Sequence, residues 1–127
     1  MAVGRLLLDT HVFLWWNIES ARLTPEARNS ILEAELVFVS AASVWEASIK
    51  SSTGKLKLPS PILEGFGSSG FEMLPISFSH AAGVADLPFH HRDPFDRLLI
   101  AQARAEGLVL VTRDRAFEDY PVEILWA

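Results

Sequence analysis

The sequence predicts an α/β fold in which a parallel sheet of about five strands is covered by helices on both faces. Its short apolar segments lack the alternation of polar and apolar residues that marks a half-exposed strand, and helical segments separate them along the chain. The chain has 127 residues, of which 50% are hydrophobic, so it can form one substantial core. Residues 1–127 are therefore expected to form a single domain.

Caps and spacing define the elements of the first half. Uninterrupted apolar runs indicate the strands, and the second of these runs is partly β-branched. Asp9 precedes the first helix, Pro25 occupies a first helical position after Thr24, and the third helix carries apolar residues at a helical spacing. We expect strands at 6–8 and 36–39 and helices at 10–16, 25–34 and 41–52.

The second half continues this alternation and ends in a strand. Gly54 and Pro59 end the third helix, and Asp93 with Pro94 begins a long helix that Gly107 stops. We expect helices at 61–66, 80–87, 95–106 and 114–120 and strands at 71–75, 108–111 and 122–125.

Composition and charge exclude several classes of protein. The chain has no cysteine, which rules out a disulfide scaffold, a cysteine nucleophile and a thiolate metal site. No apolar run reaches the ~18 residues of a membrane helix, and Leu6–Leu8 is too short for a signal-peptide core, so we expect a cytoplasmic protein. The net charge of −5 and pI near 5.3 argue against nucleic-acid binding through overall charge.

Oxygen-bearing side chains follow three predicted strands at the point where each strand ends. Asp9 follows the first strand, Ser40 follows the second, and Thr112 and Asp114 follow the strand at 108–111. Ligands of open α/β sheets bind outside the carboxyl ends of the strands, where loops and helix N-termini converge. We therefore expect these side chains at one edge of the sheet.

Two further carboxylates belong to helices beside that edge. Asp96 lies in the first turn of the helix at 95–106, and Glu46 lies on an apolar stretch where a carboxylate needs a partner. Simpler explanations exist, since Asp9 and Asp114 are suitable N-caps, Asp96 complements a helix dipole, and Glu46 is one turn from Lys50. The four carboxylates together favour a shared site over four separate roles.

Four carboxylates without a cysteine suit a hard divalent cation such as Mg²⁺ or Mn²⁺, which prefers oxygen ligands. Phosphodiester hydrolysis is the matching chemistry, because one cation lowers the pKa of an attacking water and a second, ~3.5–4 Å away, stabilises the leaving oxygen. Whether one or two cations bind is open. Two would offset most of the net charge of −5.

Four stretches resemble a known family in combination and order, over nearly the whole chain. They are Leu7–His11, Ser40–Glu46, His91–Ala103 and Val111–Asp114. With them the sequence resembles the PIN-domain ribonucleases, specifically the VapC toxins of VapBC toxin–antitoxin pairs. The resemblance implies a PIN-like three-layer α/β/α fold and an endoribonuclease that uses Mg²⁺ or Mn²⁺. It also implies structured RNA such as tRNA or ribosomal RNA as substrate, a small VapB-type antitoxin as inhibitor, and a homodimer.

The resemblance assigns roles to particular residues. The implied catalytic and metal-binding carboxylates, followed by their supporting hydroxyls, are Asp9, Glu46, Asp96 and Asp114, with Thr10 and Thr112. Asp93 is an extra acid that we expect to cap its helix. Arg113 departs from the family, where many members have Asn or acidic residues before the last Asp, and it would moderate the negative field of the site.

Two other functions stay open at this stage. A receiver-like signalling module would also hold Mg²⁺ in an acidic pocket of a parallel α/β domain, but it needs an Asp where Ser40 stands and a Lys where Arg113 stands. The other alternative is a PIN-fold protein that has lost catalysis, which the complete set of carboxylates disfavours.

The histidines and a pair of tryptophans carry weaker signals. Adjacent His90 and His91 cannot both point into one site, and no histidines are spaced i, i+4, so we expect them to be exposed or to contact substrate. Trp15 and Trp16 belong either to a fully buried helix or to a groove for a partner, which would be a second copy or the antitoxin's C-terminal segment.

Overall fold

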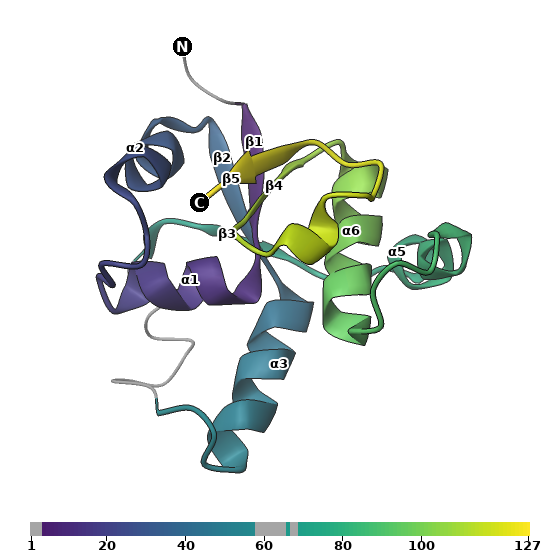
Figure 1. The fold of residues 1–127 in the computed structure, drawn as a ribbon, viewed down its shortest axis with the longest axis horizontal. Helices are drawn as coiled ribbons and strands as arrows, with labels where there is room; N and C mark the ends of the chain where they lie inside the picture. The colour runs from purple at the N-terminus through teal and green to yellow at the C-terminus, as the bar shows by residue number, and fades with distance from the viewer. Residues whose placement is uncertain (1–3, 58–65, 67–68) are drawn as a thin grey trace.

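A parallel sheet forms the centre of the molecule (Figure 1). The computed structural model describes residues 4–57, 66 and 69–127, and in these residues the sheet has five strands in the order β3-β2-β1-β4-β5, all parallel. In chain order the strands are β1 (Arg5–Leu8), β2 (Leu36–Ser40), β3 (Glu72–Leu74), β4 (Val109–Thr112) and β5 (Ile124–Trp126). The predicted fold class is confirmed.

Short polar side chains begin the helices. The N-cap side chains of Asp9, Thr24, Ser40, Ser77 and Asp93 each accept a hydrogen bond from a backbone N–H two or three residues ahead. The helices they begin are α1 (Thr10–Asn17), α2 (Pro25–Glu33), α3 (Ala41–Ser52), α5 (Phe78–Gly83) and α6 (Pro94–Glu106). Gly107 ends α6 with a φ of 66°, a left-handed conformation that glycine adopts without steric cost.

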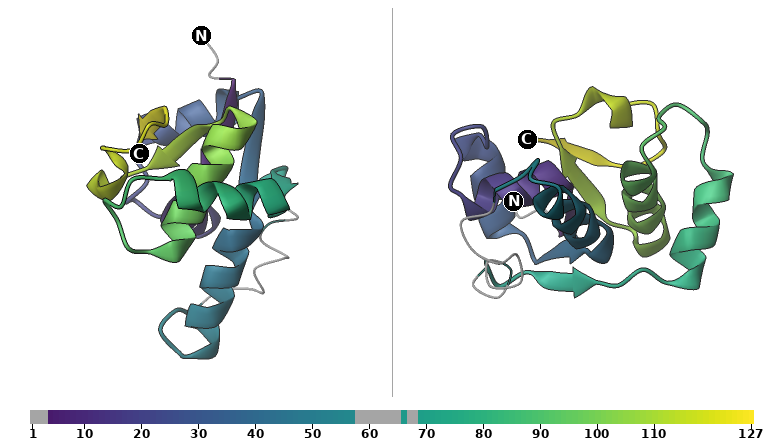
Figure 2. Two further views of the ribbon diagram at one scale, coloured as in Figure 1. Left: turned by 90° about the vertical axis from the view of Figure 1, so that its right-hand side faces the viewer. Right: turned by 90° about the horizontal axis from the view of Figure 1, so that it is seen from below.

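The two faces of the sheet bury different side chains, which produces three layers. Leu7 and Leu110 pack with α6 on one face, whereas Leu6, Leu8 and Val111 pack with α1 and α2 on the other. Figure 1 shows α1 and α2 on one side of the strands and α5 and α6 on the other. In Figure 2, seen from below, α3 lies between α1 and α6, both of which it contacts.

Two predicted helices differ from the structure, and one lies outside it. The helix expected at 80–87 begins earlier, because Ser77 and His80 form a capping box, and it ends at Gly83 before a 3₁₀ turn, η1 (Val84–Asp86). The helix expected at 114–120 is only a 3₁₀ turn, η2 (Arg115–Phe117), closed by i to i+3 hydrogen bonds. The helix expected at 61–66 lies outside the described residues apart from Phe66. In the described ranges, no helix combines the length and apolar character needed to cross a bilayer.

Candidate functional site

The site begins where the strand order reverses. From β1 the chain builds outward through β2 to β3, and it returns to the other side of β1 as β4, so the connections after β1 and β4 diverge and leave room for a ligand. Asp9 follows β1, and its Oδ2 accepts a hydrogen bond from the Thr112 hydroxyl at 2.5 Å. Thr112 Oγ1 in turn accepts from the backbone N–H of Asp114 at 3.1 Å. The two strand ends are thus joined through one hydroxyl.

Glu46 reaches the same region from α3. Its Oε1 lies 2.9 Å from the hydroxyl of Thr10, which also lies 3.0 Å from the hydroxyl of Ser43. A carboxylate only accepts, so Thr10 donates to Glu46 and Ser43 donates to Thr10. Glu46 Oε2 pairs with Lys50 Nζ at 2.9 Å. Glu46 therefore contacts one of the two predicted supporting hydroxyls, and it also forms the simpler ion pair one turn along its helix.

Asp96 lies in the first turn of α6 and pairs with a histidine. His91 Nε2 is 2.8 Å from Asp96 Oδ2. Asp93 caps α6, because its Oδ1 accepts from the backbone N–H groups of Phe95 and Asp96, and this agrees with the expected role of Asp93. The cap and the histidine together fix the carboxylate of Asp96 beside the start of the helix.

Burial raises the pKa of two of the predicted carboxylates. Desolvation raises the pKa of Asp9, although hydrogen bonds from Thr112 and Val12 act in the opposite direction. Desolvation also raises the pKa of Asp96 to about 7, opposed by the hydrogen bond from His91 and reinforced by the negative charges of Asp93 and Asp9. Asp9 and Asp96 are thus close enough to repel each other when both are ionised.

The donor chemistry fits a hard cation, although the four predicted carboxylates do not all lie within 4.8 Å of one another. Carboxylate and hydroxyl oxygens are the ligands that Mg²⁺ and Mn²⁺ prefer. Among the described residues, the group whose potential ligand atoms all lie within 4.8 Å of one another is His91, Asp93 and Asp96. Of the four predicted carboxylates only Asp96 belongs to it. Ser40 does not join the acids, since its hydroxyl caps α3 and donates to Gln102.

An arginine and a tyrosine hold the loop that carries His91. The side chain of Arg97 is buried and donates to the carbonyl oxygens of Pro88, His91 and Val84 and to the Tyr120 hydroxyl. The same hydroxyl accepts from the backbone N–H groups of His90 and His91, at 3.2 and 2.8 Å. Tyr120 and Arg97 therefore keep His91 over the first turn of α6.

Tyr120→Phe is expected to lower the free energy of unfolding by about 1–3 kcal/mol, because it leaves buried donors without an acceptor. Urea unfolding followed by circular dichroism measures the change. Since Tyr120 is the only tyrosine, loss of its ring absorbance provides a check on the variant. An unchanged unfolding midpoint would show that water replaces the hydroxyl at no cost.

The sequence interpretation missed this loop, and one signal for it was available. Arg97 shares a helix face with Ile100 and Ala101, one turn along α6, and a cation on an apolar face needs partners. The histidines were expected to be exposed or to contact substrate. That expectation is wrong for His80, which is 3% exposed, bonds to Ser77 and lies 2.8 Å from Glu106. His91 is half-buried against Asp96.

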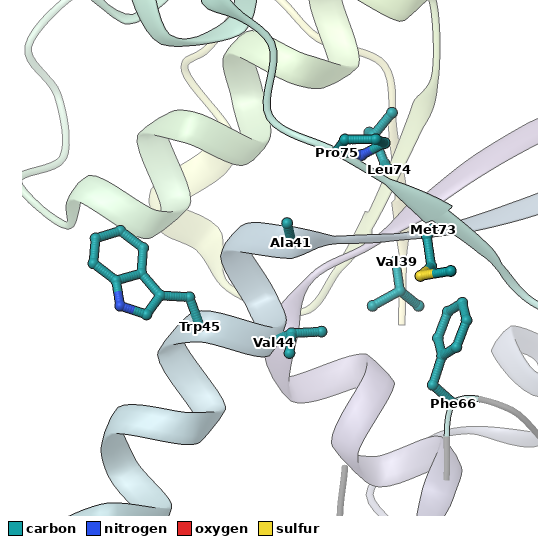
Figure 3. Close-up of a pocket in the computed structure, with 8 residues that line it drawn as sticks. All are labelled: Val39, Ala41, Val44, Trp45, Phe66, Met73, Leu74 and Pro75. Carbon is teal, nitrogen blue, oxygen red and sulfur yellow. The ribbon is translucent and has the colours of Figure 1, made fainter. Parts of the chain in front are cut away.

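Two cavities flank the junction of the helices and the sheet. One, of 320 Å³, is lined by Asp9, His11, Trp15, Arg22, Arg113 and Asp114. The other, of 340 Å³, is apolar, and Figure 3 shows Val39, Val44, Met73 and Phe66 around it, with Trp45 on the side of α6. The first cavity contains two of the predicted carboxylates, so it is the opening of the candidate site.

Trp15 and Trp16, although adjacent in the sequence, have different neighbours. Of the two alternatives for this pair, the fully buried helix does not hold, because both Trp15 and Trp16 are half-buried. Trp16 packs against Phe71 with ring centroids 5.5 Å apart and lies under the guanidinium of Arg28. Trp15 faces the cavity that contains Asp9 and Asp114. The pair therefore does not form one continuous surface.

Comparisons of the sequence and of the fold with known proteins point to the same family. Residues 6–123 match the PIN domain. The chain is 33% identical over 118 residues to Ribonuclease VapC22 of Mycobacterium tuberculosis (strain ATCC 25618 / H37Rv), and the match covers 91% of each chain. The fold is similar to VapBC2 of Rickettsia felis (TM-score 0.72, 16% identity, 96% of this chain and 98% of that one). It is equally similar to VapBC of Salmonella typhimurium (TM-score 0.72, 21% identity, 98% of each chain).

Proposed function

Because this chain belongs to the PIN-domain family, we propose that it is a metal-dependent endoribonuclease and the toxin of a VapBC-type pair. The relative named Ribonuclease VapC22 supports the activity, since the match covers 91% of both chains. The observation that carries the proposal is the buried Asp9 at the strand-order reversal, held by Thr112 and close enough to Asp96 to raise its pKa. Carboxylates whose pKa is raised by burial and by each other are typical of functional sites.

Asp9, Glu46, Asp96 and Asp114 would hold Mg²⁺ or Mn²⁺. When bound, such a cation activates water for attack on phosphorus and offsets the charge of the phosphate. Asp9 is already oriented, because Thr112 binds its Oδ2 and the N–H of Val12 binds its Oδ1. A ligand whose orientation is fixed before binding loses less entropy when it coordinates.

Lys50 and His91 pair with two of the other predicted carboxylates. Lys50 pairs with Glu46 at 2.9 Å, and His91 pairs with Asp96 at 2.8 Å. Thr10 donates to the other oxygen of Glu46. These pairings offset the repulsion among the acids, and they would weaken as a divalent cation takes over the charge.

The experiment is cleavage of RNA by the purified protein, free of antitoxin, with Mg²⁺ or Mn²⁺ and then with a chelator. Activity is expected with either cation and none with the chelator. Glu46→Gln is expected to abolish cleavage with the fold intact, since the amide cannot supply a charged ligand. Undiminished cleavage in chelator would contradict the proposal.

Lys50→Gln is the matched control for Glu46. Both variants break the same ion pair, so they should behave alike if Glu46 serves only that pair. If Glu46 binds the metal, Lys50→Gln keeps cleavage within about tenfold of the wild type while Glu46→Gln loses it. Equal activities in the two variants would assign Glu46 to the ion pair alone.

The two alternative functions named in the sequence analysis, a receiver-like module and an inactive PIN-fold protein, are affected differently by these findings. A receiver-like module has lost its support, because the match is to the PIN domain over residues 6–123. A PIN-fold protein without activity is the outcome if no RNA is cut with either cation. The antitoxin is supported by solved structures of similar fold, which are VapBC complexes.

A homodimer is the second part of this proposal. The support is exposed apolar surface beside the apolar cavity of α3 and β3, where the exposed fractions of Trp45 and Met73 are 58% and 69%. Contiguous apolar surface of this kind is typical of an interface. Sedimentation of the purified chain would distinguish a dimer from a monomer.

A further inference from the structure

Gln102 is a fully buried polar side chain that the proposed cleavage chemistry does not use. Its exposed fraction is 0%, and its neighbours along α6, Leu99–Ala101 and Ala103, are buried as well. A polar side chain at such a position costs free energy unless it forms hydrogen bonds. The amide of Gln102 is therefore of interest for the contacts that an apolar residue could not make.

This amide joins three other segments to α6. Its Oε1 accepts from the hydroxyl of Ser40 at 2.5 Å, and its Nε2 donates to the carbonyl oxygen of Pro75 at 3.3 Å. Nε2 also lies 3.3 Å from Nδ1 of His80. Ser40 ends β2, Pro75 follows β3, and His80 belongs to α5. One side chain thus connects α6 to the ends of two strands and to a neighbouring helix.

The contact with Ser40 also reaches α3. The Ser40 hydroxyl donates to Gln102 and accepts from the backbone N–H of Ala42 at 2.9 Å, which makes Ser40 the N-cap of α3. Ser40 is fully buried, so solvent does not compete for either hydrogen bond. The first turn of α3 is therefore tied to α6 through a single hydroxyl.

Two of the predicted carboxylates lie at equal distances from this contact along their helices. Glu46 lies six residues after Ser40 on α3, and Asp96 lies six residues before Gln102 on α6. Six residues of helix span about 9 Å. Glu46 and Asp96 are thus carried by two helical arms of similar length that begin at the Ser40–Gln102 hydrogen bond.

The two arms run on the same side of that hydrogen bond and touch again beside the acids. Trp45 and Phe95 each precede one of the carboxylates by one residue, and their ring centroids are 4.9 Å apart, edge to face. Figure 3 shows Trp45 on the side of α3 that faces α6. The ring contact therefore reports the separation of the arms at the level of Glu46 and Asp96.

The angle between the arms decides whether both carboxylates can reach one site. Functional side chains must be held within ~0.5 Å of their working positions. At the end of an arm of about 9 Å, a tilt of roughly 3° already moves a residue by that amount. Trp45 is 58% exposed, whereas Ser40 and Gln102 are 0% exposed. The buried hydrogen bond is therefore the more rigid of the two contacts between the arms.

We propose that Gln102 is a positioning residue of the metal site: through Ser40 it fixes the angle between α3 and α6 at which Glu46 and Asp96 bind the same cation site. Gln102 itself contacts neither the cation nor RNA. The inference rests on the proposed function, which it deepens by assigning the placement of two ligands to a residue outside the acidic set.

The network of Gln102 supplies a matched control. The ring of His80 bonds to the cap of α5 and to the end of α6, and none of these partners lies on α3. His80→Leu therefore disturbs the α5 side of the network and keeps the hydrogen bond between Ser40 and Gln102. Thr24→Ala is the control for the loss of a cap, since Thr24 caps α2 as Ser40 caps α3.

The experiment measures binding of Mn²⁺ to the purified full chain without RNA, by electron paramagnetic resonance of the free ion, well below the melting temperature. Gln102→Met keeps the length of the side chain and removes the amide, and it is expected to raise Kd for Mn²⁺ about tenfold. Ser40→Ala removes the same hydrogen bond and should raise Kd by a similar factor. His80→Leu and Thr24→Ala should melt at lower temperatures and bind Mn²⁺ as the wild type does.

The double variant Ser40→Ala with Gln102→Met tests whether the two residues act as a unit. One hydrogen bond can be lost only once, so Kd should again rise about tenfold. A rise of about a hundredfold would show two independent effects and would overturn the proposal. An equal loss of Mn²⁺ binding in His80→Leu would also overturn it, because general loosening would then explain the result. If Gln102→Met does not fold, Ser40→Ala against Thr24→Ala decides.

The positioning role and the nuclease can fail separately. Cleavage of RNA in Mn²⁺, with an unchanged Kd for Mn²⁺ in Gln102→Met, supports the nuclease and contradicts the positioning role. Mn²⁺ binding that depends on Gln102 and Ser40, without cleavage of RNA, supports the positioning role and contradicts the nuclease. A wild-type chain that binds no Mn²⁺ would contradict both.

Discussion

Asp96→Asn is expected to reduce RNA cleavage by more than about 100-fold and, at the same time, to raise the melting temperature of the metal-free protein. The loss of activity follows from the loss of a charged ligand, because even residues that only orient a ligand cost ~10–100-fold when changed. The gain in stability follows from the surroundings of the carboxylate. Burial and the charges of Asp93 and Asp9 raise the pKa of Asp96 to about 7, so the ionised form destabilises the folded state.

The simpler explanation of Asp96 predicts the opposite sign. If its charge only complements the dipole of α6, Asn would lower stability by about 0.3–1 kcal/mol. Asn is nearly isosteric, and its carbonyl oxygen can still accept from His91. Melting curves in chelator at pH 8 decide between the two readings, since Asp96 is mostly ionised there.

Asp119→Asn is the control for net charge. Asp119 is exposed and lies outside both cavities, so this variant should melt and cleave as the wild type does. A lower melting temperature for Asp96→Asn, combined with full activity, would return Asp96 to a role in helix stabilisation.

The part of the site that could be predicted from the sequence is the part that follows from strand ends. Asp9 and Thr112 come directly after buried apolar runs, and adjacent parallel strands bring their carboxyl ends together. The same rule also placed Ser40 among the side chains of the site. A residue that follows a strand can instead begin a helix, and the Ser40 hydroxyl caps α3. The rule identifies the edge, but it does not distinguish a ligand from a cap.

Contacts made by loops were beyond this reasoning. The His91–Asp96 contact depends on a loop that folds back over α6 and is held by Tyr120, 29 residues away in sequence. No periodicity encodes such a contact. The 3₁₀ turn at Arg115–Phe117 was predicted as a longer helix for a related reason, since Asp114 caps either structure equally well.

Trp15 and Trp16 show a different limit. Their adjacency suggested one shared role, yet neighbouring positions on a helix point about 100° apart. Trp16 therefore packs against Phe71, whereas Trp15 faces the cavity with Arg113. The helical angle alone separates the two roles, but only the structure identifies what lies on each side.

The stability of the metal-free protein is expected to fall as the pH rises from about 4 to about 7. The pKa of Asp96 is 3.8 in the unfolded chain and about 7 in the folded one, and burial raises the pKa of Asp9 as well. Between these values the folded state binds more protons than the unfolded state, so the free energy of unfolding decreases with pH. The stabilisation that Asp96 contributes is complete below about pH 4, on the order of 4 kcal/mol, and is lost by about pH 8.

Divalent cation should reverse this trend, because it binds the ionised carboxylates of the folded state alone. Mg²⁺ stabilises by mass action and competes with protons, so its effect on the melting temperature should grow from pH 5 to pH 8. Asp96→Asn should show both a flatter pH profile in chelator and a smaller shift with Mg²⁺. Thermal melts of both proteins at three pH values, with chelator and with Mg²⁺, test these expectations together. If stability in chelator rises from pH 4 to pH 7 and Mg²⁺ shifts the two proteins equally, Asp96 does not belong to a metal site.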